Sequence, residues 1–237
     1  MAKYSDRVES VSIQLIIFDL DGTLVDSSHD IRTAVNVAVE PYGCRPITVE
    51  ETRELVGEGV TVLIEKVMAL ESLDADRETL VSRFLSYYSE HLIELTSVYA
   101  GVEEALASLS SYRKAVVSNK REDLCLRTLR ELGLSAYFDI VVGSETAAAK
   151  KPSPVPIYYV LEKMDIHPEN AVIVGDSTYD VEAGRSAGIR TVAVTYGYRP
   201  AEMLQDADAL IDSMSELPEL LNRWGARVED RSSSWRL

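Results

Sequence analysis

The chain has 237 residues, a formal net charge of −15 and a pI near 4.7, and this length suits one sizeable domain or one core with a smaller insertion. Such an acidic chain repels a nucleic-acid duplex or an anionic membrane, so neither is an expected partner. Hydrophobic residues make up 46% of the sequence, but no apolar run approaches the ~18 residues that a membrane span needs.

The N-terminal sequence and the cysteines indicate a cytoplasmic location. The first ten residues, MAKYSDRVES, contain no apolar segment, so we expect no secretory signal. Cys44 and Cys125 are far apart in the sequence, and two free thiols are favoured over a disulfide. The three histidines, at 29, 91 and 167, show no ligand spacing with one another or with the cysteines, so a His/Cys zinc site is not expected.

Along the chain, the first regular element is a continuous apolar run at 13–18, which is typical of a buried strand in a parallel sheet. Residues 28–95 then show apolar positions at helical spacing, with helices expected at 60–70 and 77–95. Thr48 and Glu51 form a capping-box pattern that opens a further helix in this segment. The pattern predicts a helical insertion directly after the first strand.

Strands alternate with helices in the rest of the chain. A helix at 121–132 ends before Gly133, and a helix at 179–187 ends before Gly188. Alternation of this kind indicates βαβ units and an α/β/α three-layer fold with a parallel sheet. We expect the tail at 225–237 to be frayed. The further expected elements are strands at 115–117, 139–143, 171–175, 191–194 and 209–211 and a helix at 155–164.

Polar side chains follow the predicted strands or open a helix. Ligands of open parallel sheets collect beyond the carboxyl ends of the strands, so these residues are expected to converge. Each one alone also fits a simpler interpretation, as a turn residue, a helix cap or a surface charge. The set comprises Asp19, Asp21, Ser118, Asn119, Lys150, Lys151, Asp176 and Asp180.

Charge arithmetic predicts a cation among these residues. Asp19, Asp176 and Asp180 would repel one another around one crevice unless positive charge lay between them. Oxygens from Asp19, Asp176 and a backbone carbonyl near Asp21 suit Mg²⁺, which prefers hard oxygen ligands. With Lys151 beside the metal, the site would hold a phosphate dianion and favour phosphoryl transfer, where catalysis is mainly positioning and electrostatics.

Four motifs, DLDGTLVDS (19–27), VVSNK (116–120), KKPSP (150–154) and VGDSTYD (174–180), resemble in order and spacing those of the haloacid dehalogenase superfamily of phosphohydrolases. The resemblance implies a Rossmann-like core formed by residues 1–27 and 96–237. It also implies a helical cap domain formed by residues 28–95.

The same resemblance implies roles for the motif residues. Asp19 would attack phosphorus, Asp21 would exchange a proton with the leaving group and then with water, and Lys151 would offset the charge between Asp19 and the phosphate. The dehalogenases of the superfamily lack the second aspartate, so Asp21 indicates phosphoesters as substrates. The remaining implied roles are Mg²⁺ ligation by Asp19, Asp176 and the Asp21 carbonyl, phosphate binding by Gly22, Thr23, Ser118 and Asn119, and support from Asp180 and Ser177.

The cap segment ELVGEGVTVLIEKVM (54–68) resembles that of phosphoglycolate phosphatases, in which a glycine-flanked turn faces the active site. Gly57, Glu58 and Gly59 are therefore candidate substrate-binding residues, although a plain inter-helix turn fits the same pattern. Glu58 could pair with Arg53 in the cap. A dinucleotide-binding loop is excluded because no strand precedes the turn and a third glycine is absent.

The favoured function is a Mg²⁺-dependent phosphatase acting on small phosphomonoesters through an aspartyl-phosphate, with 2-phosphoglycolate as the first substrate to test. A sugar phosphomutase, in which His29 would contact the sugar, is the nearest alternative, followed by a pyrophosphatase or nucleotidase. A non-catalytic binding protein is a remote alternative, because Asp19, Asp21, Lys151 and Asp176 are all present. The sequence leaves open whether the protein is a monomer or a homodimer.

Overall fold

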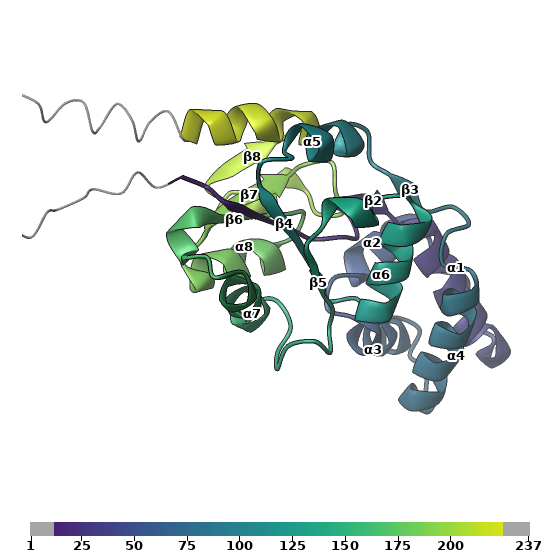
Figure 1. Cartoon of the computed structure of the whole chain (residues 1–237). Coiled ribbons are helices and arrows are strands. Elements are labelled where there is room, and N and C mark those ends of the chain that lie inside the picture. The colour runs from purple at the N-terminus through teal and green to yellow at the C-terminus, as the bar shows by residue number, and fades with distance from the viewer. Residues whose placement is uncertain (1–11, 225–237) are drawn as a thin grey trace, which may run out of the picture.

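The computed structural model describes residues 12–224, so the expected frayed tail at 225–237 lies outside the described part. One parallel sheet forms the centre of the molecule, with strand order β5-β4-β1-β6-β7-β8 (Figure 1). The strand β1 lies in the middle, where Ile17 is in register with Ala115 of β4 and Ile173 of β6. The strands are β1 (Leu15–Phe18), β4 (Arg113–Val117), β5 (Ile140–Val142), β6 (Ala171–Gly175), β7 (Arg190–Val194) and β8 (Ala209–Ile211).

Helices cover both faces of this sheet, which confirms the predicted three-layer, Rossmann-like fold (Figure 1). Ile16 and Phe18 pack on one face and Leu15 and Ile17 on the other, and all four side chains are fully buried. Burial on both faces explains why the first strand is continuously apolar. The first face carries α5 (Val102–Ser108), α6 (Glu122–Glu131) and residues 217–224, and the second carries α7 (Val155–Met164) and α8 (Thr178–Ala187).

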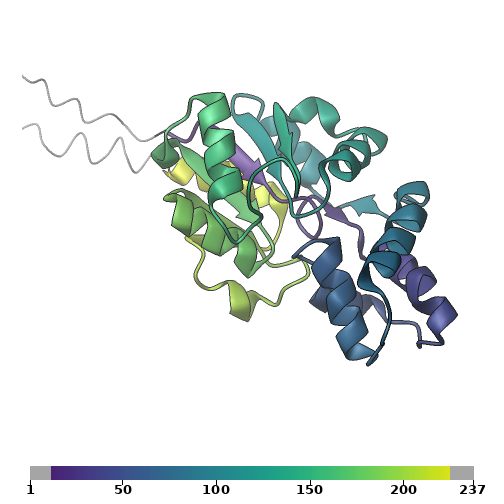
Figure 2. The same cartoon turned by 90° about the horizontal axis from the view of Figure 1, so that it is seen from below.

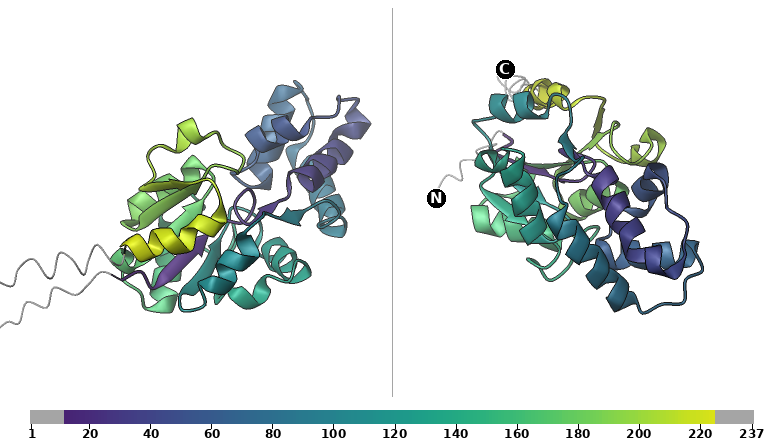
Figure 3. Two further views of the ribbon diagram at one scale, coloured as in Figure 1. Left: turned by 90° about the horizontal axis from the view of Figure 1, so that it is seen from above. Right: turned by 90° about the vertical axis from the view of Figure 1, so that its right-hand side faces the viewer.

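An inserted helical cap stands beside the carboxyl edge of the sheet, as the views from below and above show (Figures 2 and 3). Its apolar side chains, among them Val35, Ile64 and Phe84, form one cluster that Leu124 of α6 joins. Thr48 and Glu51 form the predicted capping box. The cap helices are α1 (Ser28–Val39), α2 (Val49–Leu55), α3 (Val60–Leu70) and α4 (Arg77–Glu90).

Two short strands that the sequence pattern did not reveal connect the cap to the core. They are β2 (Val25–Asp26) and β3 (Ser97–Val98), and they pair antiparallel. The helix α4 ends at Glu90, five residues before the predicted end at 95. The reason is the buried Asp30 carboxylate, which accepts hydrogen bonds from the backbone amides of residues 94, 95 and 96 at 2.8–3.1 Å. These amides therefore bind a carboxylate instead of helical carbonyls.

Two further expectations concern membranes and cysteines. Within residues 12–224, no helix is long and apolar enough to cross a membrane. Cys44 and Cys125 are both free thiols, as the sequence predicted.

Candidate active site

A cleft lies between the cap and the carboxyl ends of the central strands. Asp19 follows β1, Ser118 follows β4 and Asp176 follows β6, and all three side chains line this cleft. The opposite wall comes from the cap and includes Gly57 and Tyr88. The topology of the sheet therefore brings together the strand-end residues that the sequence singled out.

Lys151 lies at the centre of the charged residues. Its Nζ is 2.9 Å from Asp19 Oδ1 and 2.6 Å from Asp180 Oδ1, and its side chain is 2% exposed. Burial alone would lower the pKa of this ammonium, but the two carboxylates hold the pKa above its ordinary value. The neighbouring Lys150 points elsewhere and donates to the carbonyl oxygen of Glu58 at 2.8 Å. Of the two adjacent lysines, only Lys151 reaches the proposed nucleophile.

Asp176 lies near Asp19 and is held by two hydrogen bonds. Its Oδ2 accepts a hydrogen bond from the Tyr198 amide at 2.7 Å, and its Oδ1 accepts one from Thr23 Oγ1 at 3.3 Å. Burial, with added repulsion from Asp19 and Asp180, raises the pKa of Asp176 to about 8. Gly22 packs directly against it, because a Cβ there would lie 2.3 Å from Asp176 Oδ2 and the backbone φ is +88°. Only glycine fits this approach.

The donor set fits a divalent cation. Carboxylate oxygens of Asp19, Asp176 and Asp180 lie within 4.8 Å of one another, and burial raises the pKa of Asp19 to about 6. Three carboxylates around the single ammonium of Lys151 leave two surplus negative charges when all are ionised. Hard oxygen donors with this charge suit Mg²⁺. The Asp19 Oδ1–Lys151 contact is an ion pair without hydrogen-bond geometry, so that buried oxygen has no directed donor.

Asp180 is saturated by protein donors. Its Oδ1 binds Lys151, and its Oδ2 accepts hydrogen bonds from the amide and Oγ of Ser177 at 3.2 and 2.6 Å. This leaves Asp19 and Asp176 as the side chains best placed to hold a metal, with Asp180 and Ser177 supporting them. The side chain of Asp21 lies outside the carboxylate cluster, so only its backbone carbonyl remains a predicted ligand.

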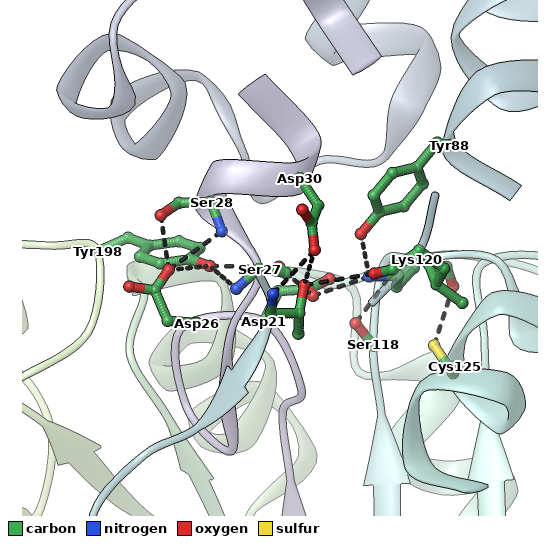
Figure 4. A network of polar contacts seen from close by, with 12 residues as sticks. Asp21, Asp26, Ser27, Ser28, Asp30, Tyr88, Ser118, Lys120, Cys125 and Tyr198 are labelled. Atoms are coloured by element: carbon green, nitrogen blue, oxygen red, sulfur yellow. Dashed lines mark hydrogen bonds and ion pairs between the residues drawn. The ribbon is translucent and has the colours of Figure 1, made fainter. Parts of the chain in front are cut away.

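Asp21 makes a separate set of contacts (Figure 4). Its Oδ1 accepts hydrogen bonds from Ser27 Oγ at 2.6 Å and from Lys120 Nζ at 2.9 Å. Lys120 also donates to Tyr88 OH of the cap at 2.8 Å. Burial alone would lower the pKa of Lys120, but Asp21 and Tyr88 hold that pKa well above its ordinary value. Lys120 is the last residue of the motif VVSNK, but the sequence assigned it no role, and nothing in the spacing of α4 marks Tyr88.

Ser118 and Asn119 serve different purposes. Ser118 Oγ accepts one long hydrogen bond, 3.4 Å from the Lys120 amide, and donates to no acceptor within residues 12–224, so its proton is free for a phosphate. The Asn119 amide group donates to Gly57 O at 2.8 Å and to Lys151 O at 2.9 Å, and its Oδ1 accepts from the Lys151 amide. Asn119 therefore fixes Lys151 and the cap turn in place.

In the turn after β1, some backbone amides already donate hydrogen bonds within the turn. The amides of Gly22 and Thr23 donate to the carbonyls of Val25 and Leu20 at 2.8 and 3.3 Å. The amide of Asp21 has no acceptor in the part of the chain that the structure describes, so it is a free donor for an anion here.

The cap turn at 57–59 borders the cleft through its two glycines. Glu58 binds Lys66 Nζ at 2.6 Å and Tyr179 OH at 2.8 Å. Its possible partner Arg53 instead pairs with Asp26 at 2.8 Å. Neither Glu58 nor His29 is among the residues that line the cleft.

Comparisons with known proteins agree with this geometry. Residues 16–194 match the family described as haloacid dehalogenase-like hydrolase. A phosphoglycolate phosphatase of Aquifex aeolicus is 38% identical over 212 residues, which cover 89% of this chain and 97% of the relative. A phosphoglycolate phosphatase of Neisseria meningitidis serogroup A is 36% identical and covers 88% of this chain and 94% of its own length. The crystal structure of a predicted phosphoglycolate phosphatase from Haemophilus somnus 129PT superposes with a TM-score of 0.84 at 29% identity, over 88% of this chain and 97% of that one.

Proposed function

This chain belongs to the haloacid dehalogenase-like hydrolase family and is a phosphatase, and from that premise we propose that it hydrolyses small phosphomonoesters with Mg²⁺ through an aspartyl-phosphate on Asp19. We further propose 2-phosphoglycolate as the substrate, and a division into a core of residues 1–27 and 96–237 and a cap of residues 28–95. The observation that carries the proposal is the buried Lys151 ammonium between Asp19 and Asp180, with the Asp176 carboxylate within 4.8 Å of both carboxylates.

In the first step, an ionised Asp19 oxygen attacks phosphorus and the bond from phosphorus to the substrate's ester oxygen breaks. Lys151 offsets the charge of Asp19 and of the transferring group, and the free hydroxyl of Ser118 and the Asp21 amide donate to its oxygens. Asp21 gives its proton to the departing alkoxide, which leaves as an alcohol. The products are the alcohol, the phosphorylated Asp19 and an ionised Asp21.

In the second step, a water molecule takes the place of the alcohol. Asp21, now ionised, removes a proton from the water while the water oxygen attacks phosphorus. The bond between phosphorus and Asp19 breaks, phosphate leaves, and Asp19 returns as a carboxylate with Asp21 protonated again. The mechanism therefore needs two carboxylates in different roles, and here Asp19 belongs to the carboxylate cluster while the side chain of Asp21 lies outside it.

Asp19 and Asp176 would hold the Mg²⁺, with the Asp21 carbonyl as a further oxygen ligand. When bound, the ion supplies positive charge against the transferring phosphoryl group and against the cluster of carboxylates. The surplus negative charge of that cluster supports this assignment, since buried carboxylates in contact are costly unless a cation joins them.

The substrate assignment rests on the relatives named phosphoglycolate phosphatase and on a cleft closed by the cap, which suits a small ester. The mutase alternative gains no support, because His29, its candidate sugar contact, does not line the cleft.

Measuring phosphate release from about twenty phosphometabolites, with Mg²⁺ and with EDTA, tests the proposal. We expect turnover only with Mg²⁺ and the highest kcat/KM for 2-phosphoglycolate. Absence of Mg²⁺-dependent turnover on every phosphomonoester would refute the phosphatase mechanism. Faster turnover of another ester would refute only the substrate.

A further inference from the structure

We propose that Lys120 is a positioning residue for Asp21, and that Tyr88 of the cap strengthens this positioning by holding Lys120. The inference rests on the proposed function, because it concerns the proton exchange assigned to Asp21.

The two oxygens of Asp21 have different surroundings. Oδ1 accepts hydrogen bonds from both Ser27 Oγ and Lys120 Nζ (Figure 4). Oδ2 has no hydrogen-bond partner within residues 12–224, and the residue lines the cleft. Two donors on one oxygen fix the rotation of the carboxyl group and leave the other oxygen for the proton that the reaction exchanges. Removing Lys120 leaves a single hydroxyl donor and a freer rotation.

Lys120 is itself fixed from both parts of the molecule. On the core side, the backbone carbonyl of Lys120 accepts a hydrogen bond from the Ser144 amide at 2.9 Å, which holds the loop that carries Lys120. The side chain then extends to the cap, where it donates to Tyr88 OH at 2.8 Å and lies 5.0 Å from the centre of the Tyr88 ring. Only 7% of the Lys120 side chain is exposed.

Tyr88 belongs to α4 and is 2% exposed. This hydroxyl reaches Lys120 because α4 packs beside the core loop that carries it; without that contact, water would take its place beside the ammonium. A lysine that pairs in water keeps many rotamers, because a solvated ion pair gains little from one geometry. The contact between Lys120 and Tyr88 thus couples the orientation of Asp21 to the position of the cap through one shared ammonium.

The test compares two substrates that differ in their need for a proton. The alkoxide of 2-phosphoglycolate, or of whichever alkyl phosphomonoester turns over fastest, needs one on leaving. Acetyl phosphate is of similar size, but its leaving acetate is stable without a proton. We expect Lys120→Met to lower kcat about 100-fold on the alkyl ester and less than about 3-fold for aspartyl-phosphate formation from acetyl phosphate in a single turnover. Tyr88→Phe should act in the same direction, by about 5–10-fold.

Lys163→Met and Tyr87→Phe are the matched controls, because Lys163 lies on the exposed surface of α7 and Tyr87 stacks on His91. Both controls should match the wild type on both substrates. Lys120→Arg should recover at least about a tenth of the lost kcat on the alkyl ester, since it restores a charged donor.

Loss of equal size on both substrates would assign Lys120 a purely structural role and overturn the inference, as would an unchanged kcat. An arginine variant as slow as the methionine variant would also contradict it. A wild type that hydrolyses neither substrate would overturn the proposed function, and the role of Lys120 with it. Selective loss in the variants of a working enzyme would support both.

Discussion

The core edge of the cleft and its cap edge differ in which groups form them: side chains on the core edge and mainly backbone carbonyls on the cap edge. On the core side, side chains make the site, since Lys151 pairs with Asp19 and Asp180, and the Asp176 carboxylate lies within 4.8 Å of both carboxylates. On the cap side, the turn that borders the cleft is held mainly through its backbone, in addition to the Tyr179–Glu58 hydrogen bond. Side chains of the core donate to its carbonyls. Arg199 donates to the carbonyls of residues 53 and 56, Asn119 to that of residue 57, and Lys150 to that of residue 58.

This difference explains which half of the site a sequence reveals. Chemistry on the core side needs a carboxylate or an ammonium at one position, so the residue type carries the information. A backbone carbonyl is present whatever the side chain, so cap docking leaves little trace in the residue types of the turn. Substitutions should therefore be severe at the core edge and mild at the cap turn.

The largest expected effect is at the nucleophile. Asp19→Asn keeps the shape of the side chain but removes the attacking charge, so kcat should fall on the order of 10⁴-fold or more. Burial raises the pKa of Asp19 to about 6, so its charge is costly in the metal-free fold and the variant should melt no lower than the wild type in EDTA. Phosphate release and a thermal melt measure the two effects. An active Asp19→Asn enzyme would show that another residue attacks phosphorus.

Lys151 and Lys150 allow the two edges to be compared, because Lys151 contacts the core carboxylates and Lys150 contacts the cap turn. Lys151→Met leaves the buried carboxylates of Asp19 and Asp180 without their counter-charge, and we expect a loss of about 3–5 kcal/mol in the free energy of unfolding together with loss of turnover. Lys150→Met removes one hydrogen bond to a cap carbonyl, worth about 1 kcal/mol, and should raise KM several-fold. Urea denaturation and steady-state kinetics on both variants provide the comparison. Equal damage from both substitutions would remove the distinction between the two edges.

The pH dependence of stability sharpens the account of the core edge. Burial raises the folded-state pKa of Asp19 from 3.8 to about 6 and that of Asp176 from 3.8 to about 8, so each carboxyl binds its proton more tightly in the folded protein. The protonated carboxyls therefore stabilise the folded state. This contribution is fully present below pH 3.8, the pKa of both groups in the unfolded chain, and is lost as the pH rises through the folded-state pKa values to about 8. The metal-free protein should lose a few kcal/mol over this range (roughly 1.4 kcal/mol per pH unit at most for each group).

Magnesium should reverse that loss, because it binds the ionised carboxylates. Urea denaturation at several pH values, with EDTA or with Mg²⁺, should show a larger stabilisation by Mg²⁺ at pH 8 than at pH 5. Asp176→Asn serves as the control and should flatten the metal-free profile in its upper part. A stabilisation by Mg²⁺ that does not vary with pH would place the ion away from these two carboxylates.

The smallest effect is expected at the cap turn. Glu58→Gln keeps an acceptor for Lys66 and Tyr179, and the carbonyls that dock the turn are unchanged. We expect kcat/KM to change less than about 3-fold, with Glu65→Gln, at another surface ion pair of α3, as the control. A change above about tenfold would mean that the Glu58 side chain, and not only its backbone, takes part in the site.

The fold was predictable because its signals are local. Continuous apolar runs marked all six strands of the sheet, and glycines marked the ends of α6 and α8. The strands β2 and β3 were missed because each has only two residues, which is too short for a period to appear. The end of α4 was misplaced because a carboxylate 64 to 66 residues away, at Asp30, takes the amides that would have continued the helix.

The site divides in the same way. The spacing of the motifs placed Asp19, Ser118, Lys151 and Asp176 at one edge, where the structure brings them together. Lys120, Tyr88 and Arg199 gain their roles from contacts between distant segments, such as the 32 residues that separate Lys120 from Tyr88. No periodicity or motif spacing encodes such a contact, because it depends on how the cap sits on the core.

The paired strands β2 and β3 determine how the insertion is joined to the core. Val25 lies opposite Val98 and Asp26 lies opposite Ser97, so the chain leaves the core and returns to it at neighbouring points. The core therefore accommodates the whole insertion as it would a hairpin loop, and the entropy of closing such a loop grows only slowly with its length. One insertion can be exchanged for another of different size at this junction while the catalytic strand stays in place. The junction therefore keeps the length of the insertion independent of the strand β1 and the carboxylates that follow it.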